Sequence, residues 1–280
     1  MAEQQTALWA SGAAYESYVG RWSRIVAREF LNWFAGRAGL SWLDVGCGTG
    51  ELTKAIVETQ SPSRVVGIDP SEGFIAFARE HVQVENVEFD VGDAMSLPYE
   101  EDEFDAVVSG LVLNFVPGPD RALSEMARVT RPEGIVAAYV WDYADKMEMI
   151  RRFFDAAVAL DPGAAEFDEG PRFTICDPDR LAETFERASF REVDTQAIEV
   201  STTFRNFDDY WTPFLAGTGV APHAGLAFRG KTDGVARPVT RDIAHSAGRI
   251  DPASRPCPGR QGDKLVAQIH LRDRTITLCR

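Results

Sequence analysis

The chain has 280 residues, of which 45% are apolar, and a formal net charge of −14. This length and composition predict one α/β domain with an insertion, or two small domains, and provide enough apolar residues for a core. The acidic balance argues against a nucleic-acid partner, and the absence of a long apolar run argues against a membrane span or secretory signal, so we expect a cytoplasmic protein.

The spacing of the cysteines argues against a zinc-binding protein and against a disulfide-rich protein. The four cysteines are scattered, with neither the paired spacing of a zinc site nor the density of a disulfide framework. We therefore expect no metal centre and a reducing compartment.

The first predicted element is an amphipathic helix. Trp22, Phe30 and Phe34 belong to a set of apolar residues that recurs at helical spacing over residues 21–35. Such a helix covers one face of a sheet.

A strand–turn–helix pattern at residues 41–57 is the centre of the predicted fold. Residues 41–45 form an apolar run, Gly46, Gly48 and Gly50 follow, and a helical pattern begins at Glu51. Glycines allow positive φ and let a ligand approach the backbone, and the helix start offers unpaired N–H groups. In an open α/β sheet such a turn lies at the carboxyl end of a central strand, where ligands bind.

The spacing of these glycines argues against a dinucleotide as the ligand. A dinucleotide fingerprint G-x-G-x-x-G requires a third glycine at position 51, where this chain has Glu51. A carboxylate at the first helical turn also opposes a pyrophosphate. An ordinary glycine-rich turn with no ligand remains the alternative.

An acidic residue follows the second predicted strand, residues 64–69. Asp69 ends this strand, and its carboxylate is able to accept hydrogen bonds from both hydroxyls of a ribose. Asp69 as the cap of the next helix is the alternative, although Ser71 is the better cap residue. Phe74 lies either against an adenine or in the core.

Further elements continue the α/β pattern. The sequence predicts strands at 87–91, 104–109 and 135–141, a helix at 120–129, and a turn at 131–134 before the fifth strand.

The motifs LDVGCGTG, VVGIDPS, VGDAMSLPYEEDEFDAVVS and EMARVTRPEG occur in this order. Over about residues 15–142 the chain resembles class I S-adenosylmethionine (SAM) methyltransferases, of the type 11 group that acts in ubiquinone and menaquinone biosynthesis. The resemblance implies a Rossmann-like doubly wound α/β sheet, mostly parallel with an antiparallel last strand. It also implies S-adenosyl-L-methionine as cofactor and a small-molecule methyl acceptor.

The resemblance also implies the cofactor-binding residues. Tyr18 would lie on the cofactor and Arg21 would pair with its carboxylate, although an exposed arginine is an equal alternative. Asp93 would accept from the adenine amino group, unless it is only a turn residue, and the segment from Ser109 to Asn114 would cross the cleft mouth beside the sulfonium. The full set is Tyr18, Arg21, Asp44, Gly46, Cys47, Gly48, Asp69, Pro70, Phe74, Asp93, Ala94, Ser109 and Gly110.

We expect four regions along the chain. Residues 1–35 form a helical cap over the cofactor site, residues 36–142 the SAM-binding core, and residues 143–223 an acceptor-region insertion with the rest of the core. The insertion contains a helix at 147–160, followed by a helix at 179–188 capped by Asp177 and a strand within 190–203. Four phenylalanines either line an acceptor pocket or pack in the core: Phe153, Phe154, Phe167 and Phe173.

Residues 224–280 have an anomalous composition. Glutamate is absent, basic residues outnumber aspartate, and periodicity is lost over a stretch too long for an ordinary loop. The expected last strand is not evident, with residues 264–278 as a possible substitute. Because a one-base shift of the codons permits a helical stretch and a strand, we hypothesise that this tail is a frameshift product.

These observations predict a SAM-dependent methyltransferase with no identified general base. Asp142 and Tyr143 follow the fifth strand, where a base is needed, but a solvated strand end is the simpler interpretation. Two alternatives stay open: a non-catalytic SAM-binding protein of methyltransferase ancestry and an NAD-dependent oxidoreductase. The acceptor and the oligomeric state are not encoded in any recognisable motif.

Overall fold

The computed structural model describes residues 20–34, 38–202, 204–206, 209–210 and 263–271. The chain divides into two units. The insertion unit comprises Met1–Trp22, Asp142–Phe173 and Glu199–Lys264, and the sheet unit comprises Ser23–Trp141, Thr174–Ile198 and Leu265–Arg280.

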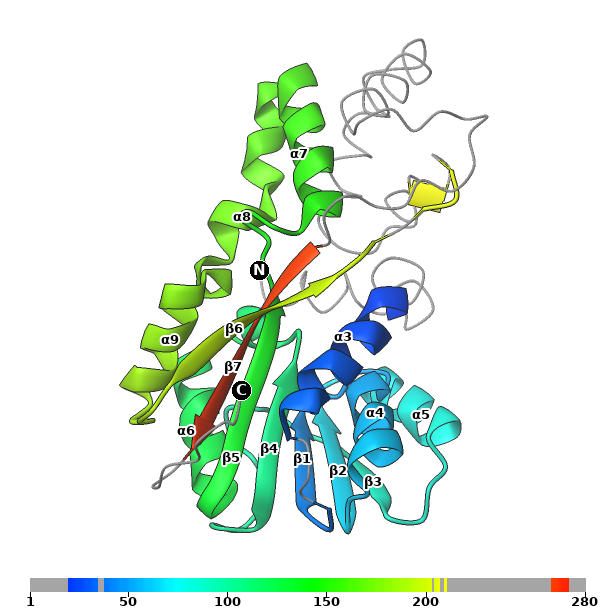
Figure 1. Cartoon of the computed structure of the whole chain (residues 1–280), viewed down its shortest axis with the longest axis vertical. Helices are drawn as coiled ribbons and strands as arrows, with labels where there is room; N and C mark the ends of the chain where they lie inside the picture. Colours follow the sequence, from blue (N-terminus) through cyan, green and yellow to red (C-terminus); the bar gives the residue numbers. More distant parts are fainter. Residues whose placement is uncertain (1–19, 35–37, 203, 207–208, 211–262, 272–280) are drawn as a thin grey trace. The chain divides into compact units, whose positions relative to one another are not determined.

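The sheet has seven strands in the described part of the chain, in the order β3-β2-β1-β4-β5-β7-β6 (Figure 1). The first five run parallel and β7 is antiparallel to β5. The predicted mostly parallel sheet with an antiparallel last strand is therefore confirmed. The strands are β1 (Ser41–Val45), β2 (Arg64–Asp69), β3 (Val87–Val91), β4 (Phe104–Gly110), β5 (Thr130–Trp141), β6 (Asp194–Val200) and β7 (Asp263–Leu271).

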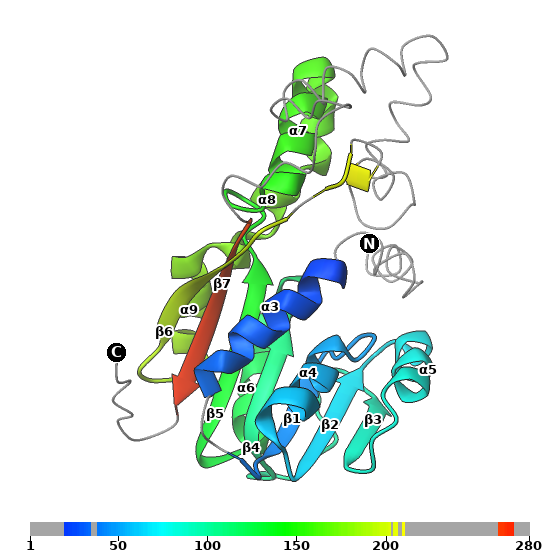
Figure 2. The same cartoon turned by 45° about the vertical axis from the view of Figure 1, so that its right-hand side comes forward.

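Helices connect the parallel strands. The crossovers β1-α4-β2 and β2-α5-β3 move along the sheet in one direction and β4-α6-β5 moves in the other, so right-handed connections place α4 and α5 on one face and α6 on the opposite face. Figure 2 shows α4 and α5 beside β1, β2 and β3. The helices are α3 (Arg21–Leu31), α4 (Glu51–Gln60), α5 (Glu72–His81), α6 (Pro119–Val129), α7 (Glu148–Leu160), α8 (Glu169–Arg172) and α9 (Pro178–Arg187). None of the described helices is long and apolar enough to cross a membrane.

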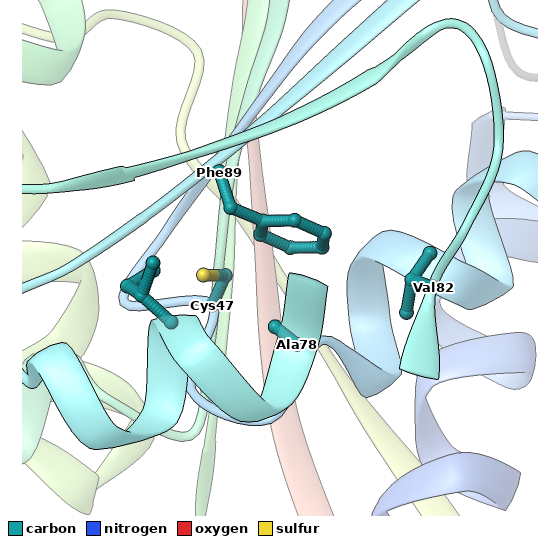
Figure 3. Packing of buried hydrophobic residues seen from close by; sticks show 5 residues of the cluster. Cys47, Ala78, Val82 and Phe89 are labelled. Carbon is teal, nitrogen blue, oxygen red and sulfur yellow. The ribbon is translucent and has the colours of Figure 1, made fainter. Parts of the chain in front are cut away.

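A small apolar cluster packs α5 against the sheet beside the glycine turn. Cys47, Ala78, Val82 and Phe89 are buried, and the Phe89 ring lies over the space between them (Figure 3). Gly67 of β2 makes room for this ring, because a Cβ there would lie 2.7 Å from Phe89 Cδ1. This close packing holds α5 against the sheet next to the end of β2.

Local predictions agree with the structure in several places. Strands β1, β2 and β3 occupy the predicted residues. Ser71 caps α5 by accepting from the Phe74 N–H at 3.3 Å, and Asp177 caps α9 by accepting from the Arg180 N–H at 3.0 Å. These caps depend on local sequence alone, so the sequence was sufficient to predict them.

The start of β5 differs from the prediction. The strand begins at Thr130, so the predicted turn at residues 131–134 lies within it as an irregular segment between the pairs Phe104↔Thr130 and Ala106↔Ile135. Glu133 takes a φ of 66° in this segment. Residues before and after the segment pair with β4, and this pairing keeps the segment in the sheet. Its Pro-Glu-Gly sequence alone indicates a turn instead.

The last strand is present as β7, Asp263–Leu271, which overlaps residues 264–278, the stretch considered as its substitute. The backbone of β7 pairs with β5 from Ile135↔Leu271 to Trp141↔Leu265. The frameshift hypothesis and the boundaries of the anomalous tail stay predictions, and residues 224–262 lie outside the described part.

Aromatic residues of the insertion unit form its core. Phe153 and Phe154 of α7 are buried and in contact at 5.3 Å between ring centroids, and Phe173 packs on Tyr143. Core packing is the role that these contacts support. Phe167 ends a 3-10 helix, Pro162–Phe167.

Candidate functional site

The glycine turn after β1 has the backbone conformation that its residues predict. Gly46, Gly48 and Gly50 all have positive φ, at 75°, 52° and 88°. The N–H groups of Gly46 and Cys47 both donate to the Ile68 carbonyl, at 2.7 and 3.0 Å. These bonds tie the turn to the end of β2, and α4 begins directly after it.

Asp69 connects the turn to the next helix. One carboxylate oxygen accepts from the Gly48 N–H at 3.1 Å, and the other accepts from the Ser71 N–H at 2.8 Å. Burial raises the pKa of Asp69, and the two backbone hydrogen bonds oppose this rise. Each carboxylate oxygen has a second acceptor position, so the group retains capacity for hydroxyl donors.

Asp44 is a buried acid within β1. Its side chain is 1% exposed, and its Oδ2 accepts from the Thr53 hydroxyl at 2.7 Å, whereas its Oδ1 has no partner among the described residues. Burial raises the pKa of Asp44 from its ordinary value of 3.8 to about 7. A buried acceptor with no partner is costly unless a ligand donates to it.

The end of β4 closes over the glycine turn. The Ser109 hydroxyl is buried and donates to the Val45 carbonyl at 2.9 Å, so it ties β4 to β1. A Cβ on Gly46 would lie 2.5 Å from Val112 Cγ1, and one on Gly110 would lie 2.6 Å from the Tyr139 hydroxyl. Both glycines are therefore required by neighbouring side chains.

The remaining predicted residues of the sheet unit surround the ends of β2 and β3. Pro70 and Asp93 are exposed, Phe74 is half-buried, and Cys47 and Ala94 are buried. Asp93 Oδ1 accepts from the Met95 N–H at 2.8 Å, which is the turn geometry considered as its alternative role. Its predicted contact with an adenine stays a prediction, as do the cofactor roles of the other residues.

Two residues near the N-terminus, Tyr18 and Arg21, were predicted to contact the cofactor. Tyr18 lies outside the described residues. Arg21, in the insertion unit, pairs with Asp209 at 3.3 Å and lies over the rings of Trp22 and Phe204 at 4.2 and 4.9 Å. Its guanidinium thus has protein partners already, and its predicted pairing with a cofactor carboxylate stays untested.

The end of β5 is not a solvated strand end. Asp142, in the insertion unit, is 7% exposed and its Oδ1 accepts from the Asp145 N–H at 2.9 Å. Burial raises its pKa. Among the described residues, no group of histidine, cysteine and acidic side chains is arranged to hold a metal ion.

Two polar residues near the turn were not included in the predicted site. Thr53, in the first turn of α4, donates its hydroxyl to Asp44 Oδ2 at 2.7 Å. Asn114, in the 3-10 helix Leu113–Phe115 after β4, has a carboxamide whose two polar atoms are buried and unpaired in the described structure. The position of Thr53 nine residues after Asp44 was a usable signal, whereas Asn114 entered only as the end of the segment that the resemblance implies beside the sulfonium.

The residues of the sheet unit fit SAM better than a dinucleotide. The turn offers open backbone at Gly48, Asp69 offers a carboxylate for a ribose, and Asp44 Oδ1, which has no partner in the described structure, offers an acceptor for an ammonium group. Glu51, at the start of α4, occupies the position where a dinucleotide fingerprint needs glycine. Its carboxylate forms an ion pair with Arg24 at 3.5 Å.

Comparisons with known proteins agree with this assignment. Residues 43–138 match the family model described as a methyltransferase domain. The chain is 34% identical over 169 residues to the demethylmenaquinone methyltransferase of Staphylococcus aureus strain JH9, an alignment that covers 56% of this chain and 70% of the relative.

Solved structures share the fold. A Haloferax volcanii methyltransferase in complex with the Trm112 activator is 18% identical, with a TM-score of 0.58 and coverage of 96% of this chain and 97% of that one. Haemonchus contortus phosphoethanolamine N-methyltransferase 2, solved with S-adenosylhomocysteine and phosphomonomethylethanolamine, is 16% identical, with a TM-score of 0.54 and coverage of 89% of this chain and 52% of that one.

The chain belongs to the class I SAM-dependent methyltransferases. The expectation of a Rossmann-like methyltransferase is therefore confirmed, and the acceptor is left to be identified.

Proposed function

We propose that the protein binds S-adenosyl-L-methionine at the turn after β1 and transfers its methyl group to a small-molecule acceptor. The observation that carries this proposal is the contact between the turn and Asp69, whose carboxylate accepts from the Gly48 N–H at 3.1 Å. The contact holds an acid at the carboxyl end of β2, beside Gly48, where a Cβ would meet no atom within 4 Å.

Residues of three strand ends would hold the cofactor. Asp69 would accept from the ribose hydroxyls, the glycine turn would pass close to the methionine part, and Asp44 would accept from its ammonium group. Asp93 and Phe74 would meet the adenine, as the resemblance implies. When bound, the cofactor supplies a methyl group that is already activated by the adjacent sulfonium.

The protein's part in such a reaction is alignment. Methyl transfer is an in-line displacement, so the site must hold the acceptor atom against the methyl carbon and exclude water. A general base is needed only if the acceptor has to lose a proton. His81, the histidine of α5, lies exposed and stacks on Phe77, so it is not suited to this.

Two other functions are separable by binding measurements. An NAD-dependent oxidoreductase would bind NAD(H), and a non-catalytic relative would bind SAM without turnover. Isothermal titration with SAM, S-adenosylhomocysteine and NADH tests these directly. We expect micromolar binding of SAM and S-adenosylhomocysteine; binding of NADH alone would contradict the proposal.

Activity requires an acceptor screen. Tritiated SAM is incubated with the protein and small-molecule extracts, and labelled products are extracted and identified. The names of the relatives justify adding quinols, after demethylmenaquinone, and phosphorylated amines, after phosphoethanolamine. SAM binding with no labelled product from any acceptor would favour the non-catalytic alternative.

A further inference from the structure

The carboxamide of Asn114 is a buried polar group with no partner. Neither its Nδ2 nor its Oδ1 makes a hydrogen bond in the described structure, and both atoms are buried. The side chain has two N–H donors and an acceptor oxygen, and burying these without partners is unfavourable. Such a group in a native protein calls for an explanation, and a ligand is one.

The backbone around Asn114 is held in one unusual conformation. Leu111 has a φ of 63°, which is uncommon for leucine, and its N–H donates to the Tyr139 carbonyl at 2.7 Å. Val112 packs against Gly46 so closely that no Cβ fits there. Strained backbone that its neighbours hold firmly in place is found preferentially at functional sites.

The sheet order places this segment on a particular side of the glycine turn. Strands β2 and β4 flank β1 on opposite sides. Asp69, the candidate ribose acceptor, ends β2, whereas Asn114 follows β4. An adenosine that extends toward β2 and β3 therefore directs the other end of the cofactor, with its methyl group, toward β4.

We propose that Asn114 binds the methyl acceptor, through a hydrogen bond to a neutral hydroxyl or carbonyl oxygen next to the atom that is methylated. This inference rests on the proposed function, because it needs the cofactor at the turn after β1. A neutral carboxamide has both donors and an acceptor, so it matches a hydroxyl, which donates and accepts, or a carbonyl, which accepts, better than an ammonium group, which only donates.

The test uses two probes that differ by one hydroxyl group. 1-Naphthol and naphthalene are titrated into the full-length protein saturated with S-adenosylhomocysteine, and dissociation constants are measured by ligand-observed NMR. We expect the native protein to prefer 1-naphthol by about tenfold, the effect of one buried hydrogen bond. In Asn114→Leu the preference should fall below about threefold, while naphthalene affinity stays within about threefold.

A second readout separates binding from a structural role. Replacing an unpaired buried amide with an apolar side chain of similar size should leave the unfolding temperature of the ligand-free protein unchanged or raise it. Asn32→Leu, the same change at an exposed asparagine, is the matched control. If N114L does not fold, Asn114→Met takes its place.

Several results would overturn the inference. These are no preference for 1-naphthol in the native protein, a preference that survives in N114L, a lowered unfolding temperature of N114L, or a parallel loss of S-adenosylhomocysteine affinity. If the native protein does not bind S-adenosylhomocysteine at all, the proposed function itself fails. If it binds S-adenosylhomocysteine but not 1-naphthol, only the role of Asn114 is rejected.

Discussion

The Gly48 N–H donates to Asp69 Oδ2 at 3.1 Å, across 21 residues of sequence. This bond joins the turn after β1 to the end of β2, and the second oxygen of Asp69 caps the backbone at Ser71. One carboxylate thus sets both the shape of the turn and the start of α5. Its substitution should affect cofactor binding and folding together.

The first prediction concerns Asp69→Asn. The amide has one acceptor oxygen, so one of the two backbone donors is left facing an NH₂ group, and a ribose diol loses a bidentate acceptor. We expect S-adenosylhomocysteine affinity to fall by about tenfold or more in titration calorimetry. Asp120→Asn, at an exposed acid on α6, is the control, and equal affinities for both variants would contradict the assigned role.

The second prediction compares two glycines of the turn. Gly46→Ala would suffer both a positive φ and a clash with Val112, whereas Gly48→Ala would suffer only the positive φ, because no atom lies within 4 Å of its Cβ. We expect Gly46→Ala to lower the free energy of unfolding by about 2 kcal/mol or more and Gly48→Ala by about 1 kcal/mol. Urea unfolding measures both.

A double variant checks the cause of this difference. Val112→Ala removes the atoms that a Cβ on Gly46 would meet, so G46A should cost less stability in the V112A background than in the native one. If the cost is unchanged, the clash is not the reason for glycine at this position.

The third prediction is a pH dependence due to Asp44. Its pKa is about 7 in the folded protein against 3.8 ordinarily, so between these values the folded state holds a proton that the unfolded chain has released. The free energy of unfolding should therefore fall as pH rises from about 4 to about 7, by an amount on the order of a few kcal/mol. Above pH 7 this contribution stays constant.

Two variants attribute this slope to Asp44. Asp44→Asn should remove it from the pH profile measured by chemical unfolding. Thr53→Val removes the hydroxyl that favours the charged form, so the slope should extend to higher pH. Thr59→Val, which removes a hydroxyl that donates to the Ala55 carbonyl, is the control and should leave the slope in place.

The fourth prediction separates two roles of Ser109. Its hydroxyl donates to the Val45 carbonyl, so Ser109→Ala should lower the free energy of unfolding by about 1 kcal/mol. If that bond is its whole role, S-adenosylhomocysteine affinity stays within about twofold of native. A larger loss of affinity would instead support the cofactor contact that the family resemblance implies.

The sequence predicted those features that depend on residues close to one another in the chain. Ser71 and Asp177 as caps, and the positive φ of three glycines, follow from local chemistry. The Asp44–Thr53 contact spans only nine residues and was open to prediction, whereas the Ser109–Val45 contact and the missing partners of Asn114 depend on elements far apart in the chain, so no pattern of spacing revealed them. Strand β7 was named only as a substitute for the expected last strand, within residues 264–278, because the preceding residues of the tail give no periodic signal; its pairing with β5 could not be read from the sequence.

The place of β7 between β5 and β6 imposes an order on biosynthesis. Strand β6 leaves the ribosome long before β7, yet its position in the sheet lies one strand beyond a gap that only residues 263–271 fill. The nascent chain must therefore keep this edge of β5 unpaired until residues 263–271 have been translated, and an unpaired strand edge is prone to pair with other chains during that interval.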